Sequence, residues 1–155
     1  MIASELIHPI IVHFPIVFFL TLAAFDGVAA VRGVEITGRT SAGNVSTGLA
    51  VLAGLAAVAA MVFGKLALGI AESHGFHSEV AEIHEGLGEF TAASFALWAL
   101  VRGFLWQRDI RPAGFSAAAV PIVEVVGGAL VVATAYYGGA LVFDLGVNVA
   151  HAANR

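Results

Sequence analysis

Six histidines are the residues in this chain that are best suited to binding a metal or a cofactor. The sequence has no cysteine and only two methionines. Thiolate zinc sites, iron–sulfur clusters, covalently attached haem and disulfides are therefore excluded, and ligands for copper(I) are scarce. Imidazole remains, and it binds zinc, copper(II) and haem iron. Two of the six histidines lie in the segment HPIIVHFPIVFF, residues 8–19, where a long apolar run begins.

His13 and His84 are predicted to form a pair of ligands. Each precedes an Arg-Gly sequence at the far end of its apolar run, Arg32 by 19 residues for His13 and Arg102 by 18 for His84. At a helical rise of about 1.5 Å per residue, both imidazoles lie roughly 27–29 Å from their arginine. Parallel helices of a bundle can bring residues of equal depth together. The spacing therefore predicts axial ligation of a b-type haem by two histidines.

The residues around this pair fit a bulky flat ligand. Gly88 lies one helical turn after His84 on the same face, where a glycine gives a macrocycle room to approach the backbone. Pro15 should bend its helix beside His13, because proline removes a backbone hydrogen bond inside a helix.

The other four histidines allow two interpretations. They could complete a second haem site or hold zinc or copper(II) together with Glu72 or Glu79, or they could belong to a hydrated acidic segment. These residues are His8, His74, His77 and His151.

Two acidic residues lie inside apolar stretches. Glu124 lies a few residues into the last stretch and is expected to form an interfacial ion pair with a nearby arginine. Asp26 is expected to pair locally, at the boundary marked by Arg32.

The composition predicts an integral membrane protein. Hydrophobic residues make up 59% of the chain and charged residues 12%, with a mean hydropathy of +0.93, which is too apolar for a soluble globule of this size. Four stretches can cross the hydrocarbon layer of a membrane: residues 9–31, 45–71, 86–101 and 117–143. We therefore expect an all-α, four-helix transmembrane bundle that forms a single domain, residues 1–155.

Basic residues predict the orientation. The first and third connections carry the arginines, whereas the second has no Lys or Arg. The positive-inside rule then places both termini, and all six histidines, on the extracytoplasmic side. The net charge of −4 and the lack of basic clusters exclude nucleic acid as a partner.

Two segments resemble a known family. HPIIVHFPIVFF and GGALVFDLGVNV, residues 138–149, are similar to the HPxxVHFP and GGxLVxxxGV signatures of the domain of unknown function 2231 family. The resemblance implies a small four-helix protein of the bacterial cytoplasmic (inner) membrane, and a link to redox modules such as Rieske-type domains. Phe143 stands where the family commonly has a tyrosine.

The sequence thus predicts a cytochrome-b-like electron-transfer subunit with one haem b near the outer face, or two if the other histidines take part. Its expected partners are membrane lipid, other subunits of a redox complex, and a quinol donor or an extracytoplasmic acceptor. No catalytic triad, phosphate loop or HExxH motif is present. The chain is small and has little soluble domain, which favours a subunit over a complete enzyme. The alternatives are a protein that binds or transports divalent metal ions and a structural subunit without a cofactor.

Overall fold

The computed structural model describes residues 7–147, and all its regular structure is helical. The helices are α1 (Ile7–Ile11), α2 (His13–Val31), α3 (Ser41–Ser73), α4 (Glu79–Gln107) and α5 (Phe115–Phe143). The described part contains no strand, which confirms the predicted all-α class. Three of the four predicted apolar stretches lie within one helix each, and the first, residues 9–31, spans α1 and α2. Helix α4 extends beyond residues 86–101 at both ends.

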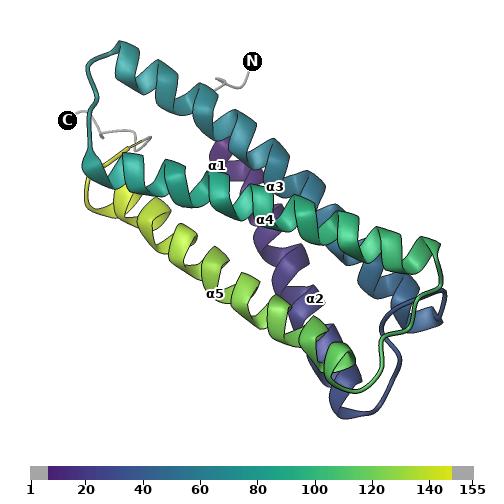
Figure 1. Cartoon of the computed structure of the whole chain (residues 1–155). Helices are drawn as coiled ribbons and strands as arrows, with labels where there is room; N and C mark the ends of the chain where they lie inside the picture. Colours follow the sequence, from purple (N-terminus) through teal and green to yellow (C-terminus); the bar gives the residue numbers. More distant parts are fainter. Residues whose placement is uncertain (1–6, 148–155) are drawn as a thin grey trace.

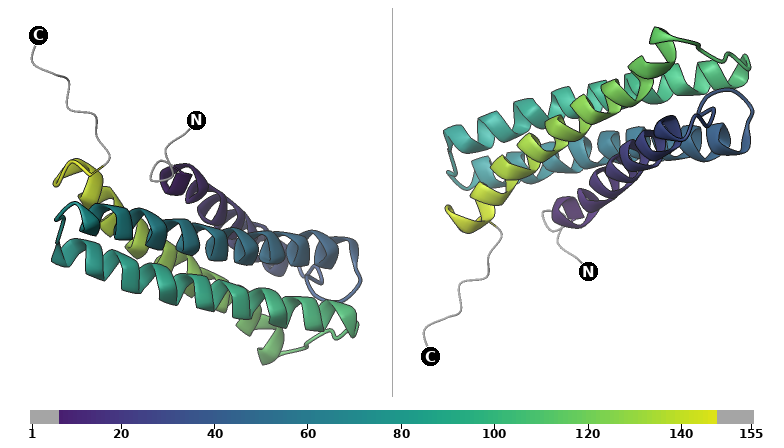
Figure 2. Two further views of the ribbon diagram at one scale, coloured as in Figure 1. Left: turned by 90° about the horizontal axis from the view of Figure 1, so that it is seen from above. Right: turned by 90° about the horizontal axis from the view of Figure 1, so that it is seen from below.

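The helices form an elongated bundle (Figure 1). The long helices α3 and α4 run antiparallel beside each other, and α2 and α5 pack against them and against each other. We call the end with the loop of residues 74–78 the histidine end, and the end with the loops of residues 32–40 and 108–114 the arginine end. Toward the histidine end, α1 and α5 diverge and make no contact, while α1 packs on α3 and α2 (Figure 2).

A break separates α1 from α2 at Val12. Pro15 has no N–H to donate to the Ile11 carbonyl, so the helix cannot continue regularly through this turn. The predicted bend beside His13 is therefore confirmed.

Among residues 7–147, three helical segments are long and apolar enough to cross a membrane: Ile7–Val31, which combines α1 and α2, then α3 and α5. Helix α4 is as long as α5, 29 residues. It differs from α5 in that it carries four glutamates near its start and one arginine near its end. Large apolar side chains nevertheless cover its outward surface, including Phe90, Leu97, Leu100 and Phe104. Such a surface is typical of a protein that contacts lipid.

The core lies between α2, α3, α4 and α5. Phe19 of α2 stacks on Phe95 of α4, with ring centroids 3.6 Å apart and an interplanar angle of 9°. Gly127 of α5 lies directly against the Phe19 ring. Small residues of α3 pack around this stack: Ala50, Ala53 and Ala57 are all buried.

Side-chain contacts hold the loops at the arginine end. Asp109 Oδ1 accepts a hydrogen bond of 2.7 Å from the Arg39 backbone N–H. This bond and the nearby Arg111 side chain lower the pKa of the Asp109 carboxyl. Trp106 donates its indole N–H to the Asn44 side chain, 2.7 Å away. The loop between α2 and α3 and the loop between α4 and α5 are thereby fixed to each other.

The Gly127 position gives a test of this packing. A Cβ placed there would lie 2.5 Å from two atoms of the buried Phe19 ring. We expect Gly127→Ala to lower the free energy of unfolding by about 1–3 kcal/mol, as overpacked cores do. Gly48→Ala is the control, because a Cβ at Gly48 meets nothing within 4 Å and removes the flexibility of a helical glycine. Denaturation in detergent, followed by circular dichroism, measures both; equal stability of the two variants would contradict the packing described.

Candidate functional site

His8 and His84 lie side by side at the histidine end. Their ring centroids are 6.1 Å apart and the rings meet edge to face at 71°. His8 Nδ1 lies 2.9 Å from the Ala60 carbonyl oxygen of α3, and His84 Nδ1 lies 3.0 Å from the Thr134 carbonyl oxygen of α5. A carbonyl can only accept a hydrogen bond, so each Nδ1 carries the hydrogen. Each Nε2 is then the nitrogen with a free lone pair.

A glycine lies under each of these rings. A Cβ at Gly64 would lie 2.9 Å from His8 Cε1, and a Cβ at Gly138 would lie 2.9 Å from His84 Cε1. Each glycine follows the bonded carbonyl by four residues, Ala60 in α3 and Thr134 in α5. The two imidazoles are thus held in the same way on two different helices, each by a carbonyl and the bare backbone one turn later.

His13 does not take part in this pair. Its side chain is exposed, and its Nδ1 lies 3.3 Å from the carbonyl oxygen of Ile10 in its own turn of chain. His8, and not His13, is therefore brought to His84. The pairing of His13 with His84 that was predicted from their depth fails for two reasons. The helix is broken beside His13. In addition, residues five apart on a helix, such as His8 and His13, point in directions about 140° apart.

His74 and His77 do not converge with the pair. His74 and His77 are exposed in the loop at the histidine end, and His74 Nδ1 lies 2.8 Å from the Ile70 carbonyl oxygen. His151 lies outside the described residues. Within residues 7–147, no group of three or more His, Asp or Glu side chains is arranged to hold a metal ion. Gly88 borders open space, since a Cβ there would meet no atom within 4 Å.

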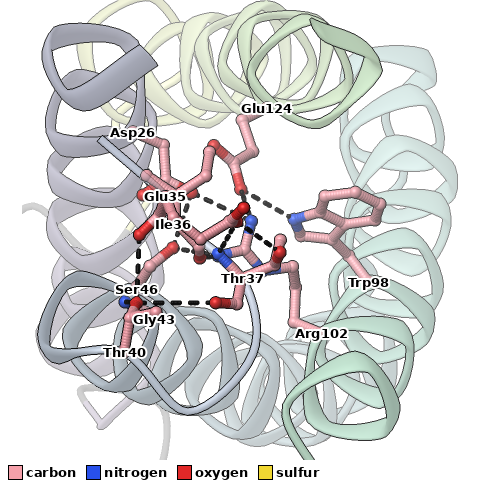
Figure 3. A network of polar contacts seen from close by, with 10 residues as sticks. All are labelled: Asp26, Glu35, Ile36, Thr37, Thr40, Gly43, Ser46, Trp98, Arg102 and Glu124. Atoms are coloured by element: carbon pink, nitrogen blue, oxygen red, sulfur yellow. Dashed lines mark hydrogen bonds and ion pairs between the residues drawn. The ribbon is translucent and has the colours of Figure 1, made fainter. Parts of the chain in front are cut away.

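Arg102 occupies the bundle interior toward the arginine end (Figure 3) and is 1% exposed. Its Nη1 donates to Asp26 Oδ2 at 2.9 Å and to Glu124 Oε1 at 3.2 Å. Its Nη2 donates to the Ile36 carbonyl oxygen at 2.7 Å and to the Ser46 hydroxyl. One side chain of α4 therefore bonds to α2, α3, α5 and the loop of residues 32–40.

The partners of Arg102 also bond to other groups. Ser46 donates its hydroxyl to Asp26 Oδ2, and Trp98 donates its indole N–H to Glu124 Oε1 at 3.1 Å. Both carboxyl groups are completely buried. A network of this kind stabilises a bundle only when nearly all of its groups are paired.

This network corrects two expectations. Asp26 pairs with Arg102 on another helix and not with Arg32, and Arg102 lies in the interior and not at a helix boundary. The predicted ion pair of Glu124 with an arginine is confirmed, although it is buried. One signal in the sequence pointed to the network: acids and a base inside different apolar stretches usually pair with one another.

Comparison with known protein families assigns the chain to one of them. The sequence model of the family described as "Predicted membrane protein (DUF2231)" matches residues 5–151. The chain belongs to this family. No curated protein and no solved structure matches it. In this DUF2231 protein, the two segments that resemble the family signatures, residues 8–19 and 138–149, supply His8 and Gly138, so both contribute to the histidine pair.

Replacing Arg102 tests the network. Arg102→Leu leaves two buried carboxyl groups without their cation, and we expect it to lower the free energy of unfolding by about 3–5 kcal/mol. Arg108→Leu serves as the control, because Arg108 is exposed and contacts only the Phe104 ring among the described ion-pair and ring interactions. Urea or thermal denaturation in micelles measures both variants. Similar stability of Arg102→Leu and the control would show that the network contributes little.

Proposed function

We propose that this protein is an electron-transfer subunit of a membrane redox complex and binds one b-type haem through His8 and His84. The single observation that supports this most strongly is the pair itself: two imidazoles from different helices, each fixed by its Nδ1–H and each with a free Nε2. A haem needs only two axial protein ligands. His13, the ligand expected from its depth, is replaced by His8 in this proposal.

The spacing of the pair fits one metal atom between the rings. Metal–imidazole bonds of about 2.0–2.1 Å, together with the two ring radii, give a centroid separation of about 6 Å for two ligands on opposite sides of an ion. The observed separation is 6.1 Å. The spacing of the two imidazoles is therefore the one that an iron atom held by both would need.

The chain's own groups would orient and tune these ligands. The hydrogen bonds to the Ala60 and Thr134 carbonyls fix the tautomer of each imidazole and raise its basicity. Helices α1 and α5 make no contact with each other toward the histidine end (Figure 2), and Gly88 borders open space on α4. A bound haem would supply one-electron transfer.

A site for a bare zinc or copper(II) ion is the second candidate, and the structure favours it less. Such sites use three or four protein ligands, whereas His8 and His84 are two and the described residues supply no third at the pair. A subunit without a cofactor is the remaining alternative, in which the same two histidines only join α1 to α3 and α4 to α5.

The proposal includes four membrane spans, with α4 as the third. Its length and its outward apolar side chains support this, and Arg102 is neutralised inside the bundle. The arginine end would face the cytoplasm of a bacterium, because Arg32, Arg39, Arg108 and Arg111 lie in its loops. The histidine pair would then lie near the outer face, within reach of a quinol or an extracytoplasmic carrier, and lipid would cover the sides.

Absorption spectroscopy tests the proposal. We expect purified protein, titrated with haemin and then reduced, to show a Soret band and sharp α and β bands. His8→Ala and His84→Ala should each reduce haem affinity by about tenfold or more, because each removes an axial ligand. His13→Ala is the matched control and should retain full binding.

Three outcomes would contradict this assignment. Loss of binding in His13→Ala but not in His8→Ala would restore the pair expected from depth alone. A colourless protein with one equivalent of zinc would establish the metal-ion alternative. A protein that binds neither group, and in which both histidine variants keep their partners' activity, would be a structural subunit.

A further inference from the structure

The buried network at the arginine end has an unbalanced charge. Asp26 and Glu124 each accept a hydrogen bond from the same Nη1 of Arg102, at 2.9 and 3.2 Å. The two carboxyl groups are fully buried and Arg102 is 1% exposed. If both acids were ionised, two negative charges would share one positive charge inside the bundle. An uncompensated buried charge is unfavourable, because neither water nor lipid can solvate it there.

Two oxygens of the same carboxyl groups have no hydrogen-bond partner. Asp26 Oδ1 and Glu124 Oε2 are buried and unpaired, while the opposite oxygens of the two groups accept every available bond. A proton on one carboxyl would remove the excess charge. It would also turn one unpaired acceptor into a donor.

Among residues 7–147, Arg102 is the only cation that forms an ion pair with either acid. Arg102 and Trp98 face them from α4, and Ser46 faces them from α3 (Figure 3). From the loop of residues 32–40 come the Ile36 carbonyl, bonded to Arg102, and Glu35. Glu35 Oε1 accepts hydrogen bonds from the backbone N–H and the hydroxyl of Thr37. The second negative charge is therefore balanced by none of the groups around the pair.

From this geometry we infer that Asp26 and Glu124 together bind one exchangeable proton, so that the network is a proton-binding site. This site is separate from the histidine pair, and the inference does not depend on a bound haem. It gives the protein a group that can take up a proton at the arginine end while its histidines lie at the other end.

A cavity offers a path to this site from the arginine end. It has a volume of about 370 Å³ and is formed by the end of α2, the loop of residues 33–37 and the start of α5. Two of its lining residues adjoin the network: the Ile36 carbonyl bonds to Arg102, and Val120 lies one turn before Glu124 on α5. Glu35 also lines the cavity. The cavity therefore extends to two residues that adjoin the network, Ile36 and Val120.

Infrared spectroscopy of the haem-free protein in micelles tests the inference. At neutral pH we expect a C=O stretching band of a protonated carboxylic acid, which shifts when the solvent is changed to D₂O. Glu124→Gln and Asp26→Asn should each abolish the band, because the carboxylate that remains is balanced by Arg102. Glu89→Gln is the control and should keep it, since Glu89 is a half-exposed partner of Lys65.

The outcomes separate the site from its alternatives. Absence of the band from the wild-type protein would show that both acids are ionised and would overturn the inference. A band that persists in both single variants would belong to another acid and would overturn it as well. A band that does not shift in D₂O would show a trapped proton and not an exchangeable one.

A separate variant tests the proposed path through the cavity. Ala118→Trp places a large side chain in the cavity wall, away from the network. We expect the infrared band to remain, and its shift in D₂O to become at least several-fold slower. An unchanged exchange rate would show that protons reach the pair by another path.

Discussion

The buried guanidinium of Arg102 is the interaction on which the bundle most depends. Inside a membrane protein, a charged side chain is tolerated only where its neighbours replace the water it has lost. Both terminal nitrogens of Arg102 meet this requirement with partners on three other helices and one loop. Few other arrangements of α2 and α5 on the α3–α4 pair are therefore possible, because a shift of any of these helices would leave a buried donor or acceptor unpaired.

The same need for satisfied polar groups organises the histidine end. There, two imidazoles bond to backbone carbonyls that already belong to helices, and this close approach is possible only because a glycine follows each carbonyl by one turn. His8 needs α3 in place, and His84 needs α5 in place. The pair therefore forms only where α1 packs on α3 and α4 packs on α5.

The sequence was sufficient to predict the helices and insufficient to predict which polar residues meet. Hydropathy fixed the approximate position of every long helix, and Pro15 marked the break before α2. The histidine pairing failed because depth along a helix says nothing about the direction of a side chain, and because Arg102 was taken as a boundary marker. A lone arginine beside a glycine indicates a helix end. Only the acids on other helices indicate that Arg102 is an interior residue.

The two polar clusters explain why a chain with so little charge keeps the charged groups that it has. Polar side chains in a membrane interior are costly, so those that remain either hold helices together or do chemistry. Arg102 needs one carboxylate for charge balance, yet the bundle supplies two, and the second adds an unfavourable charge unless a proton accompanies it. The histidine pair likewise exceeds what packing needs, because leucine at either position could fill the space without a buried nitrogen. An excess of polar groups at both ends is better explained by function than by stability, in agreement with the proposed proton site at one end and the proposed haem site at the other.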